Sequence, residues 1–425
     1  MSHPSFETLM SLVPKPSNAL PDWGTIWGLW PEEMAALDVC PQDPIHHAEG
    51  DVGIHTRMVA EALINLPAWQ VLEVDARALL FWAAVLHDIG KPATTEAQPN
   101  GRVSARGHAR VSTQMARRWL WEARAPFGWR ETLCGVIDQH LVPFWLIEKS
   151  DPRRVAIQTS WKTRADYLCL HARADCLGRI CEDQQAVLDN ISLAEESFTE
   201  LECLSRPFAF ANAASKVSFF EKESRDPFYA EFEDFRCSVT LMSGLPGSGK
   251  DHWISKNRPD MPMISLDNIR AEIGASASGN QGHVLQAARE KAREYLRVGQ
   301  DFVWNGTNIS RNLRAKPLTL FRDYNARTEI VYIERDPETL FAQNKNRDAI
   351  VPRAAMEKLI GKCEPPQDWE AHNIIRVTSY LPRPFFGAGY RLNDLQMFLK
   401  GERSRISGTM AIPAIAMCES KAECA

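Results

Sequence analysis

A glycine-rich segment that follows an apolar, β-prone run is the feature that most constrains the fold. The run SVTLMSGLPGSGKD contains the spacing G-x-x-x-x-G-K, from Gly244 to Lys250. A loop of this kind between a strand and a helix closes its backbone N–H groups around phosphate oxygens, and the lysine reaches the outer phosphates. We therefore expect a nucleotide-binding loop. Its predicted residues are Gly244, Leu245, Pro246, Gly247, Ser248, Gly249, Lys250 and Asp251.

Two kinds of periodicity divide the chain, whose 425 residues are enough for two or three domains. Apolar residues recur with helical spacing before residue 207, as in Ala76–His87 and His108–Ala123, and no alternating strand pattern is found there. After residue 237, short β-rich runs alternate with helical ones, which predicts βαβ units and a parallel sheet. The predicted strands are Cys237–Ser243, Pro262–Leu266, Asp301–Trp304, Glu329–Glu334 and Ile374–Val377.

The expected protein is multidomain, with an all-α domain followed by an α/β P-loop domain. The predicted divisions are an all-α domain at 21–207, a connector at 208–236, a P-loop domain at 237–378 and a poorly ordered tail at 379–425.

The net charge of −5 and a pI near 6.2 argue against a protein that coats nucleic acid without specificity, although a local basic groove stays open. No signal peptide and no stretch of membrane-spanning length is found, so we expect a cytoplasmic protein. The ten cysteines form no CxxC pair, which favours thiols in a reducing compartment.

A histidine–aspartate pair at the end of an apolar helix is the strongest feature of the helical part. An adjacent imidazole and carboxylate can both reach one metal only where the helix ends, and Gly90 and Pro92 supply that break. Other candidates lie on or beside other predicted helices, which could converge on one cation. The predicted metal ligands are His55, His87, Asp88, His108, His140 and Asp175.

The order of these ligands resembles that of the HD phosphohydrolase superfamily, over residues 42–178. The segment CPQDPIHHAEGDVGIHT is similar to the HD domain of bacterial tRNA nucleotidyltransferases. The resemblance implies a first metal site of His55, His87, Asp88 and Asp175, with His108 and His140 for a second metal. It also implies that Asp88 is catalytic and that Lys91 contacts phosphate, although an ordinary solvated lysine is the open alternative.

Mixed imidazole and carboxylate ligands suit one or two transition metals such as Mn, Fe, Co or Ni. Such a metal would lower the pKa of a bound water and polarise a phosphoryl oxygen. Other polar residues nearby, Arg106, Arg110, His46, His47 and His171, are given no first-rank role.

The P-loop departs from its usual pattern at Asp251, where a Ser or Thr hydroxyl normally holds Mg²⁺. A carboxylate there could still coordinate the metal, but it adds negative charge beside the triphosphate. The next strand ends near Asp267, which is placed to accept the proton of an attacking hydroxyl, with Arg270 one helical turn later. A capping Asp267 with a surface Arg270 is the open alternative.

Asp267 and Arg270 resemble the general base and the acceptor-gripping arginine of the phage polynucleotide 5′-kinase family. Thr307 and Asn308 match the family's pair after its third strand, but Gly306 replaces the family's aspartate, so Asn305 alone could supply that contact. The segment QNKNRDAIVPRAAMEKL resembles the family's lid, in which an arginine closes over the donor phosphates. Arg347 is the predicted lid arginine, and Arg353 is the second choice.

A phosphohydrolase beside a polynucleotide kinase resembles the bacterial HD-kinase end-healing proteins. The resemblance implies removal of a 3′-phosphate or 2′,3′-cyclic phosphate, and transfer of phosphate from ATP or another NTP, with Mg²⁺, to a 5′-hydroxyl. RNA or DNA ends would be the substrates and a ligase would act next. A homodimer stays open. Two alternatives also remain: a nucleotide phosphohydrolase fused to a small-metabolite kinase, and a nucleotide-sensing regulator.

Overall fold

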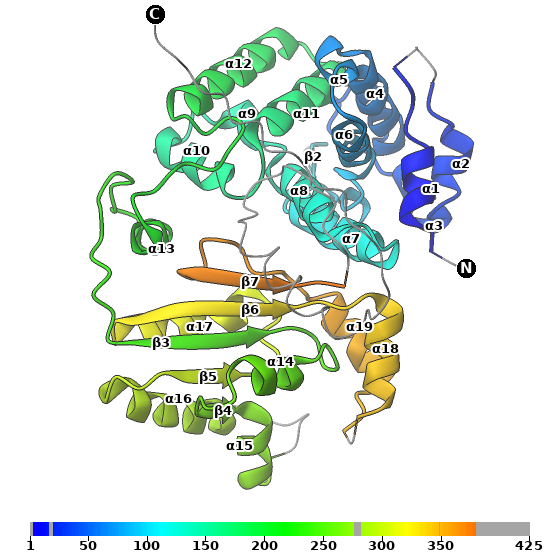
Figure 1. Cartoon of the computed structure of the whole chain (residues 1–425). Helices are drawn as coiled ribbons and strands as arrows, with labels where there is room; N and C mark the ends of the chain where they lie inside the picture. Colours follow the sequence, from blue (N-terminus) through cyan, green and yellow to red (C-terminus); the bar gives the residue numbers. More distant parts are fainter. Residues whose placement is uncertain (1–2, 17–19, 100, 276–281, 348, 380–425) are drawn as a thin grey trace, which may run out of the picture. The chain divides into compact units, whose positions relative to one another are not determined.

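The computed structural model describes residues 3–16, 20–99, 101–275, 282–347 and 349–379, all within one compact unit. A helical part precedes an α/β part with a parallel sheet, which confirms the predicted fold class (Figure 1). Apart from residue 379, the tail that was expected to be poorly ordered lies outside the described residues. None of the described helices combines the length and apolar character needed to cross a bilayer.

The helical part is built around α6 (Val74–Leu86), in which every side chain from Ala78 to Leu86 is buried. Helices α4 (Val52–Asn65), α8 (Phe127–Gln139) and α11 (Ala165–Leu177) pack against it. A helix that is apolar on all sides belongs at the centre of a bundle. The remaining elements are α1 (Phe6–Ser11), α2 (Trp23–Trp27), α3 (Pro31–Leu37), α5 (Pro67–Gln70), the 3-10 turn η1 (Lys91–Ala93), α7 (His108–Glu122), α9 (Val142–Trp145), α10 (Pro152–Ser160) and α12 (Gln184–Glu200).

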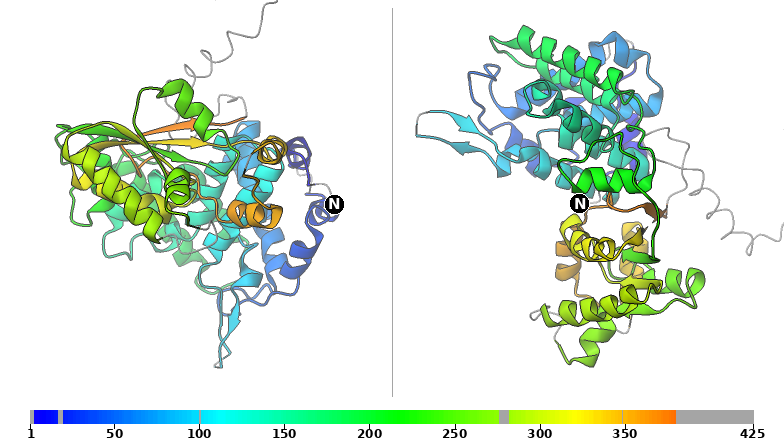
Figure 2. Two further views of the ribbon diagram at one scale, coloured as in Figure 1. Left: turned by 90° about the horizontal axis from the view of Figure 1, so that it is seen from below. Right: turned by 90° about the vertical axis from the view of Figure 1, so that its left-hand side faces the viewer.

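A small antiparallel hairpin corrects the expectation of a strand-free helical part. It consists of β1 (Glu96–Ala97) and β2 (Val103–Ser104), and it reaches out beyond the helices (Figure 2). Strands of two residues are too short to produce an alternating pattern, so the sequence carried no signal for them. Within the predicted connector lies α13 (Ala213–Glu221), which Asn212 caps by accepting from the Ser215 N–H at 2.8 Å.

Five parallel strands form the sheet, in the order β4-β5-β3-β6-β7. Every predicted strand is confirmed, with ends that shift by up to three residues. The strands are β3 (Cys237–Ser243), β4 (Met263–Ser265), β5 (Phe302–Asn305), β6 (Ala326–Ile333) and β7 (Asn373–Val377). Because all five run the same way, the segments after β3, β4 and β5 meet at one edge of the sheet.

Successive residues of β3 enter cores on opposite faces of the sheet. Val239 and Leu241 pack with the residues of α16 and α17, whereas Met242 packs with Trp253 of α14. This alternation follows from the two-residue period of a strand. The helices of this part are α14 (Lys250–Asn257), α15 (Leu266–Glu272), α16 (Gly282–Arg297), α17 (Arg311–Asp323), α18 (Pro337–Lys345) and α19 (Arg353–Ile360).

Candidate active sites

All six predicted metal ligands meet inside the helical domain. His55 lies on α4 and Asp175 on α11, His87 and His140 cap the ends of α6 and α8, and His108 begins α7. Each is buried: five of the six are at most 1% exposed, and His108 is 9% exposed. The packing of helix ends around α6 therefore brings together residues that lie far apart in the sequence.

The ligand atoms form two triads that share Asp88. His55, His87 and Asp88 make the first, and Asp88, His108 and His140 make the second, with ligand atoms within 4.8 Å of one another in each. Asp88 Oδ2 lies 3.1 Å from His87 Nε2, and Asp88 Oδ1 lies 3.2 Å from His108 Nε2. Because each carboxylate oxygen faces a different triad, Asp88 would be shared by both triads if they held metal.

Backbone hydrogen bonds fix which nitrogen of each ring faces the centre. The Nδ1 atoms of His87, His108 and His140 donate to the carbonyls of Ala84, Ala105 and Ile137 at 2.8, 2.7 and 2.7 Å. Their Nε2 lone pairs then point inward, the arrangement that second-shell bonds impose on metal-binding histidines.

The nitrogen and oxygen atoms that face the centre of the cluster lack the hydrogen-bond partners that buried polar atoms normally have. His108 Nε2 and His140 Nε2 lie 3.2 Å apart, so two lone pairs face each other unless a positive charge lies between them. Among the described residues, His87 Nε2 and Asp88 Oδ1 are buried without a hydrogen bond of acceptable geometry. Buried polar atoms are rarely left this way, so the donor set fits a divalent metal.

The electrostatics of the cluster favour the ligand forms of His140, His108 and Asp88, whereas, against the effect of burial, the neighbouring Asp88 carboxylate raises the pKa of His87. Burial lowers the pKa of His140 well below its ordinary value, and burial lowers the pKa of His108 as well. Burial alone would raise the pKa of Asp88, but His87 and Lys91 outweigh it and hold that pKa well below the usual range. Neutral imidazoles and an ionised carboxylate are the forms that bind metals.

Gly90 explains how the turn after Asp88 comes so close to α7. A Cβ on Gly90 would lie 2.6 Å from the Ser112 nitrogen and 2.7 Å from the His108 carbonyl oxygen. The Gly90 N–H donates to Ser112 Oγ at 2.9 Å. A larger residue would push α7 away and take His108 with it.

Lys91 is buried, at 9% exposure, and does not have the solvated setting of the alternative interpretation. Its Nζ lies 2.7 Å from Asp88 Oδ2 and donates to Gln42 Oε1 at 2.6 Å. Gln42 was not predicted as a site residue, because a glutamine in an irregular segment carries no sequence signal.

Glu49 is a second residue that the sequence reasoning missed. Its Oε1 lies 2.8 Å from His47 Nδ1 and 2.9 Å from His55 Nδ1, and its side chain is 1% exposed. Glu49 thus holds His55 from the side opposite the metal cluster. It also contacts His47, which was not among the predicted metal ligands. Its place in the segment that resembles other HD domains was the only available signal.

Asp175 and His171 occupy the α11 side of the cluster. Asp175 Oδ1 lies 3.2 Å from His55 Nε2, and the same carboxylate accepts a forked contact from Arg179, with Nη2–Oδ2 at 2.9 Å. Asp175 does not belong to either compact triad. The His171 ring packs 5.3 Å from the His87 ring, between centroids, in agreement with a packing role.

The P-loop follows β3, and α14 begins at Lys250. Gly244, Gly247 and Gly249 have φ angles of 150°, 80° and 97°, which side chains other than glycine rarely adopt. Lys250 Nζ donates to the carbonyls of Gly244 and Leu245 at 2.9 and 3.0 Å. Burial lowers the pKa of Lys250 to about 8.

Three predicted site residues act electrostatically on Lys250, namely Asp251, Arg347 and Asp267. Asp251 is exposed in the first turn of α14 and accepts from Asn305 Nδ2 at 2.6 Å. Arg347 Nη1 is buried and makes no hydrogen bond to the residues that the structure describes. Arg353 is 80% exposed and lies over the Phe341 ring, so the structure gives it no contact with the loop.

Asp267 lies one residue into α15, just after β4, and its side chain is 76% exposed. It does not cap the helix, because Ser265 Oγ accepts from the Asn268 N–H at 3.3 Å. Its carboxylate instead pairs with Arg270. Asp267 is therefore open to an acceptor molecule, and its charge acts on the P-loop lysine.

Thr307 and Asn308 tie the end of β5 to the P-loop strand. The Thr307 carbonyl accepts from the Gly244 N–H at 2.9 Å, and Asn308 Nδ2 donates to the Met242 carbonyl at 2.8 Å. At Gly306, a Cβ would lie 2.8 Å from Leu266 Cδ1. An aspartate at 306 would therefore have to displace the side chain of Leu266.

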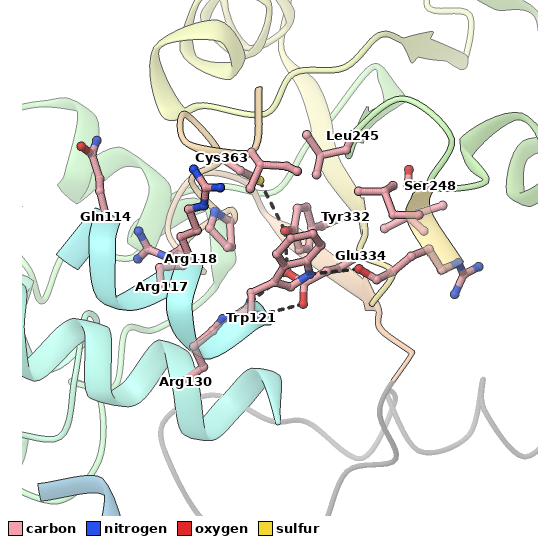
Figure 3. A pocket seen from close by; sticks show the side chains of 15 residues that line it. Gln114, Arg117, Arg118, Trp121, Arg130, Leu245, Ser248, Tyr332, Glu334 and Cys363 are labelled. Carbon is pink, nitrogen blue, oxygen red and sulfur yellow. Dashed lines mark hydrogen bonds and ion pairs between the residues drawn. The ribbon is translucent and has the colours of Figure 1, made fainter. Parts of the chain in front are cut away.

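A small cavity lies behind the P-loop, between residues of α7 and α8 and the end of β6 (Figure 3). Arg130 is fully buried, and its two Nη atoms reach the Glu334 carboxylate at 3.0 and 2.8 Å. Trp121 Nε1 donates to the Arg335 carbonyl at 3.0 Å. The cavity volume of about 40 Å³ suits a few waters at most, so it is no nucleotide site.

Comparison with protein families identifies both parts of the chain. Residues 52–168 match the family model of the HD domain, and residues 239–366 match a family model described as an AAA domain. The chain therefore joins a region that matches the HD domain to a P-loop region that matches the AAA domain model.

Curated relatives match over a limited length. A multifunctional CCA protein of Halorhodospira halophila is 35% identical over 119 residues, which cover 28% of this chain and 26% of the relative. A CC-adding tRNA nucleotidyltransferase of Thermus thermophilus is 30% identical over 142 residues, covering 33% and 30%. The chain thus spans less than a third of these relatives. A solved sugar kinase from Janibacter sp. HTCC2649 aligns with a TM-score of 0.28 and 12% identity, over 40% of this chain and 97% of the kinase.

Proposed function

We propose that the chain is an RNA end-healing enzyme, which removes 3′-terminal or 2′,3′-cyclic phosphate at the HD site and phosphorylates 5′-hydroxyl ends at the P-loop site. The observation that carries the kinase half is Asp267, 76% exposed after β4 and close enough to Lys250 to act on its charge. An exposed base suits an acceptor at the end of a polymer, whereas a small-metabolite kinase usually encloses its acceptor. The name of one curated relative, the CC-adding tRNA nucleotidyltransferase, refers to tRNA and favours RNA as the substrate class.

In the proposed kinase reaction, Asp267 takes the proton of the 5′-hydroxyl, whose oxygen attacks the γ-phosphorus of ATP. The bond from that phosphorus to the bridging oxygen breaks, and ADP leaves. Lys250 and Arg347 hold the outer phosphates, where Arg347 Nη1 is buried without a partner among the described residues. Catalysis of this kind depends mostly on positioning and charge stabilisation.

In the proposed phosphatase reaction, the oxygen of water forms a bond to the terminal phosphorus, and the bond from phosphorus to the 3′-oxygen breaks, which releases inorganic phosphate from a 3′-phosphate end. A 2′,3′-cyclic phosphate needs two such steps: a first water breaks one of the two ribose P–O bonds and opens the ring, and a second water breaks the other. A divalent metal held by His55, His87, Asp88, His108 and His140 would activate that water and polarise the phosphoryl oxygen. Lys91, held between Asp88 and Gln42, is placed to contact the phosphate.

The test uses an oligoribonucleotide with a 5′-hydroxyl and a 2′,3′-cyclic phosphate, together with γ-labelled ATP, Mg²⁺ and a panel of Mn²⁺, Fe²⁺, Co²⁺ and Ni²⁺. Asp267→Asn should lower 5′-labelling by about 10²–10⁴-fold, the usual worth of a general base, and leave 3′-phosphate release intact. Asp88→Asn, which is nearly isosteric, should do the reverse.

Three results would contradict the proposal. Loss of both activities from one substitution in a folded protein would refute two separate sites. Faster transfer to free nucleosides than to the oligonucleotide would favour the small-metabolite alternative. Nucleotide binding without transfer to any acceptor would favour a regulatory role.

A further inference from the structure

Asp251 and Asn305 are in direct contact although 54 positions separate them in the sequence. Asn305 Nδ2 donates to Asp251 Oδ1 at 2.6 Å. Asn305 is the last residue of β5, which pairs with the P-loop strand β3, and Asp251 is in the first turn of the helix that follows the P-loop. The two side chains therefore occupy the place where P-loop enzymes usually hold Mg²⁺ with a Ser or Thr hydroxyl and a strand-end aspartate.

We propose that this chain exchanges the two ligand types, so that Asp251 supplies the Mg²⁺ carboxylate from the helix and Asn305 supplies the neutral polar group from the strand. The proposal rests on the proposed nucleotide-binding function and specifies its metal contacts. Carboxylate and amide oxygens are ligands that suit Mg²⁺.

Charge explains why Asp251 is paired with an amide at the end of β5. The usual pair has one hydroxyl and one carboxylate, and this pair has one amide and one carboxylate, so either arrangement brings a single negative charge beside the phosphates. Asp251 facing a strand-end aspartate would instead place two carboxylates in contact, which disfavours ionisation of both. The negative charge that Asp251 adds is therefore offset, because position 305 carries a neutral amide instead of a carboxylate.

Burial supports a fixed role for Asn305. Its side chain is 7% exposed, while Asp251 is exposed toward the loop. The contact thus joins a rigid amide in the sheet to a carboxylate that solvent and ligands can reach. That geometry places a fixed neutral amide beside a carboxylate that Mg²⁺ can reach.

The test measures how strongly Mg²⁺ increases ADP affinity, by calorimetric titration with and without Mg²⁺. The wild-type chain should show coupling in the usual range of about 5–150-fold. Asp251→Ser and Asp251→Asn should each lose most of it, because neither leaves a carboxylate in the pair. The double variant Asp251→Ser/Asn305→Asp restores the usual ligand pair and should recover the coupling.

A matched control is Asp323→Ser, an exposed aspartate at the end of α17, near the opposite edge of the sheet from the P-loop. It should leave the coupling unchanged. Retained coupling in Asp251→Asn, or no recovery in a folded double variant, would overturn the exchanged pair. If the double variant does not fold, the coupling measured in Asp251→Asn decides whether the exchanged pair binds Mg²⁺.

The wild-type chain separates the two levels of inference. ADP binding with no Mg²⁺ dependence would overturn the exchanged pair and leave nucleotide binding standing. No ADP binding under either condition would overturn the proposed kinase function itself.

Discussion

The six predicted metal ligands of the HD domain are buried, whereas Asp251 and Asp267 of the P-loop domain are exposed. At the metal centre, backbone carbonyls, Glu49 and Arg179 already orient the ligands. At the P-loop, Lys250 donates to carbonyls of its own loop, and Arg347 Nη1 has no partner among the described residues.

The difference teaches how each site depends on its surroundings. A site made of buried helix ends is organised by the core, so it should respond to changes in packing and in the hydrogen bonds that orient its side chains. A site made of a loop and exposed carboxylates is completed by its ligand, so it should respond to the charge of the ligand and of the loop.

The largest expected effect concerns the buried ion pair that joins the two domains. Arg130→Met leaves Glu334 buried without its forked partner and should lower the free energy of unfolding by about 3–5 kcal/mol. The measurement is urea unfolding, followed by circular dichroism.

Arg124→Met is the matched control, because its pair with Glu338 is exposed, at 53% and 79%. This substitution should lower the free energy of unfolding by no more than about 1 kcal/mol. Equal losses in the two variants would show that the buried pair does not hold the domains together.

A smaller effect is expected at the metal centre. Glu49→Gln weakens the contact that orients His55 without replacing any of the six predicted metal ligands. It should reduce metal affinity by about 10–100-fold. Competition with a chelator measures that affinity. Glu96→Gln, an exposed glutamate on the hairpin, should leave it unchanged; unaltered metal binding in Glu49→Gln would remove Glu49 from the site.

The smallest effect concerns pH at the P-loop. Burial lowers the pKa of Lys250 to about 8, and phosphate binds the protonated amine, so ADP affinity should be flat below pH 8 and fall above it. The expected slope is about tenfold per pH unit, as each unit reduces the protonated fraction tenfold. Calorimetric titrations between pH 7 and about 9.5 measure it.

Lys250→Arg provides the control for this pH dependence, since a guanidinium stays charged throughout the range. The ADP affinity of this variant should not change with pH over this range, whatever its absolute value. A slope that survives in Lys250→Arg would assign the titration to another group.

The sequence by itself determined the features that rest on short segments. A strand, a glycine spacing and a helix start define the P-loop locally, and a helix end defines the His87–Asp88 pair. The five strands were also predictable, because each carries its own β-prone pattern. The two-residue strands of the hairpin were not, since so short a run has no period.

Only the tertiary structure decided which residues meet. The sharing of Asp88 by two triads, the hold of Glu49 on His55, and the contact between Asn305 and Asp251 join segments that lie far apart in the chain or have no pattern of their own. Such contacts depend on how helices pack around α6 and how β5 lies beside β3. Local propensity carries no information about that packing, and so the sequence predicted six residues that the structure brings together, but not the residues that hold them in place.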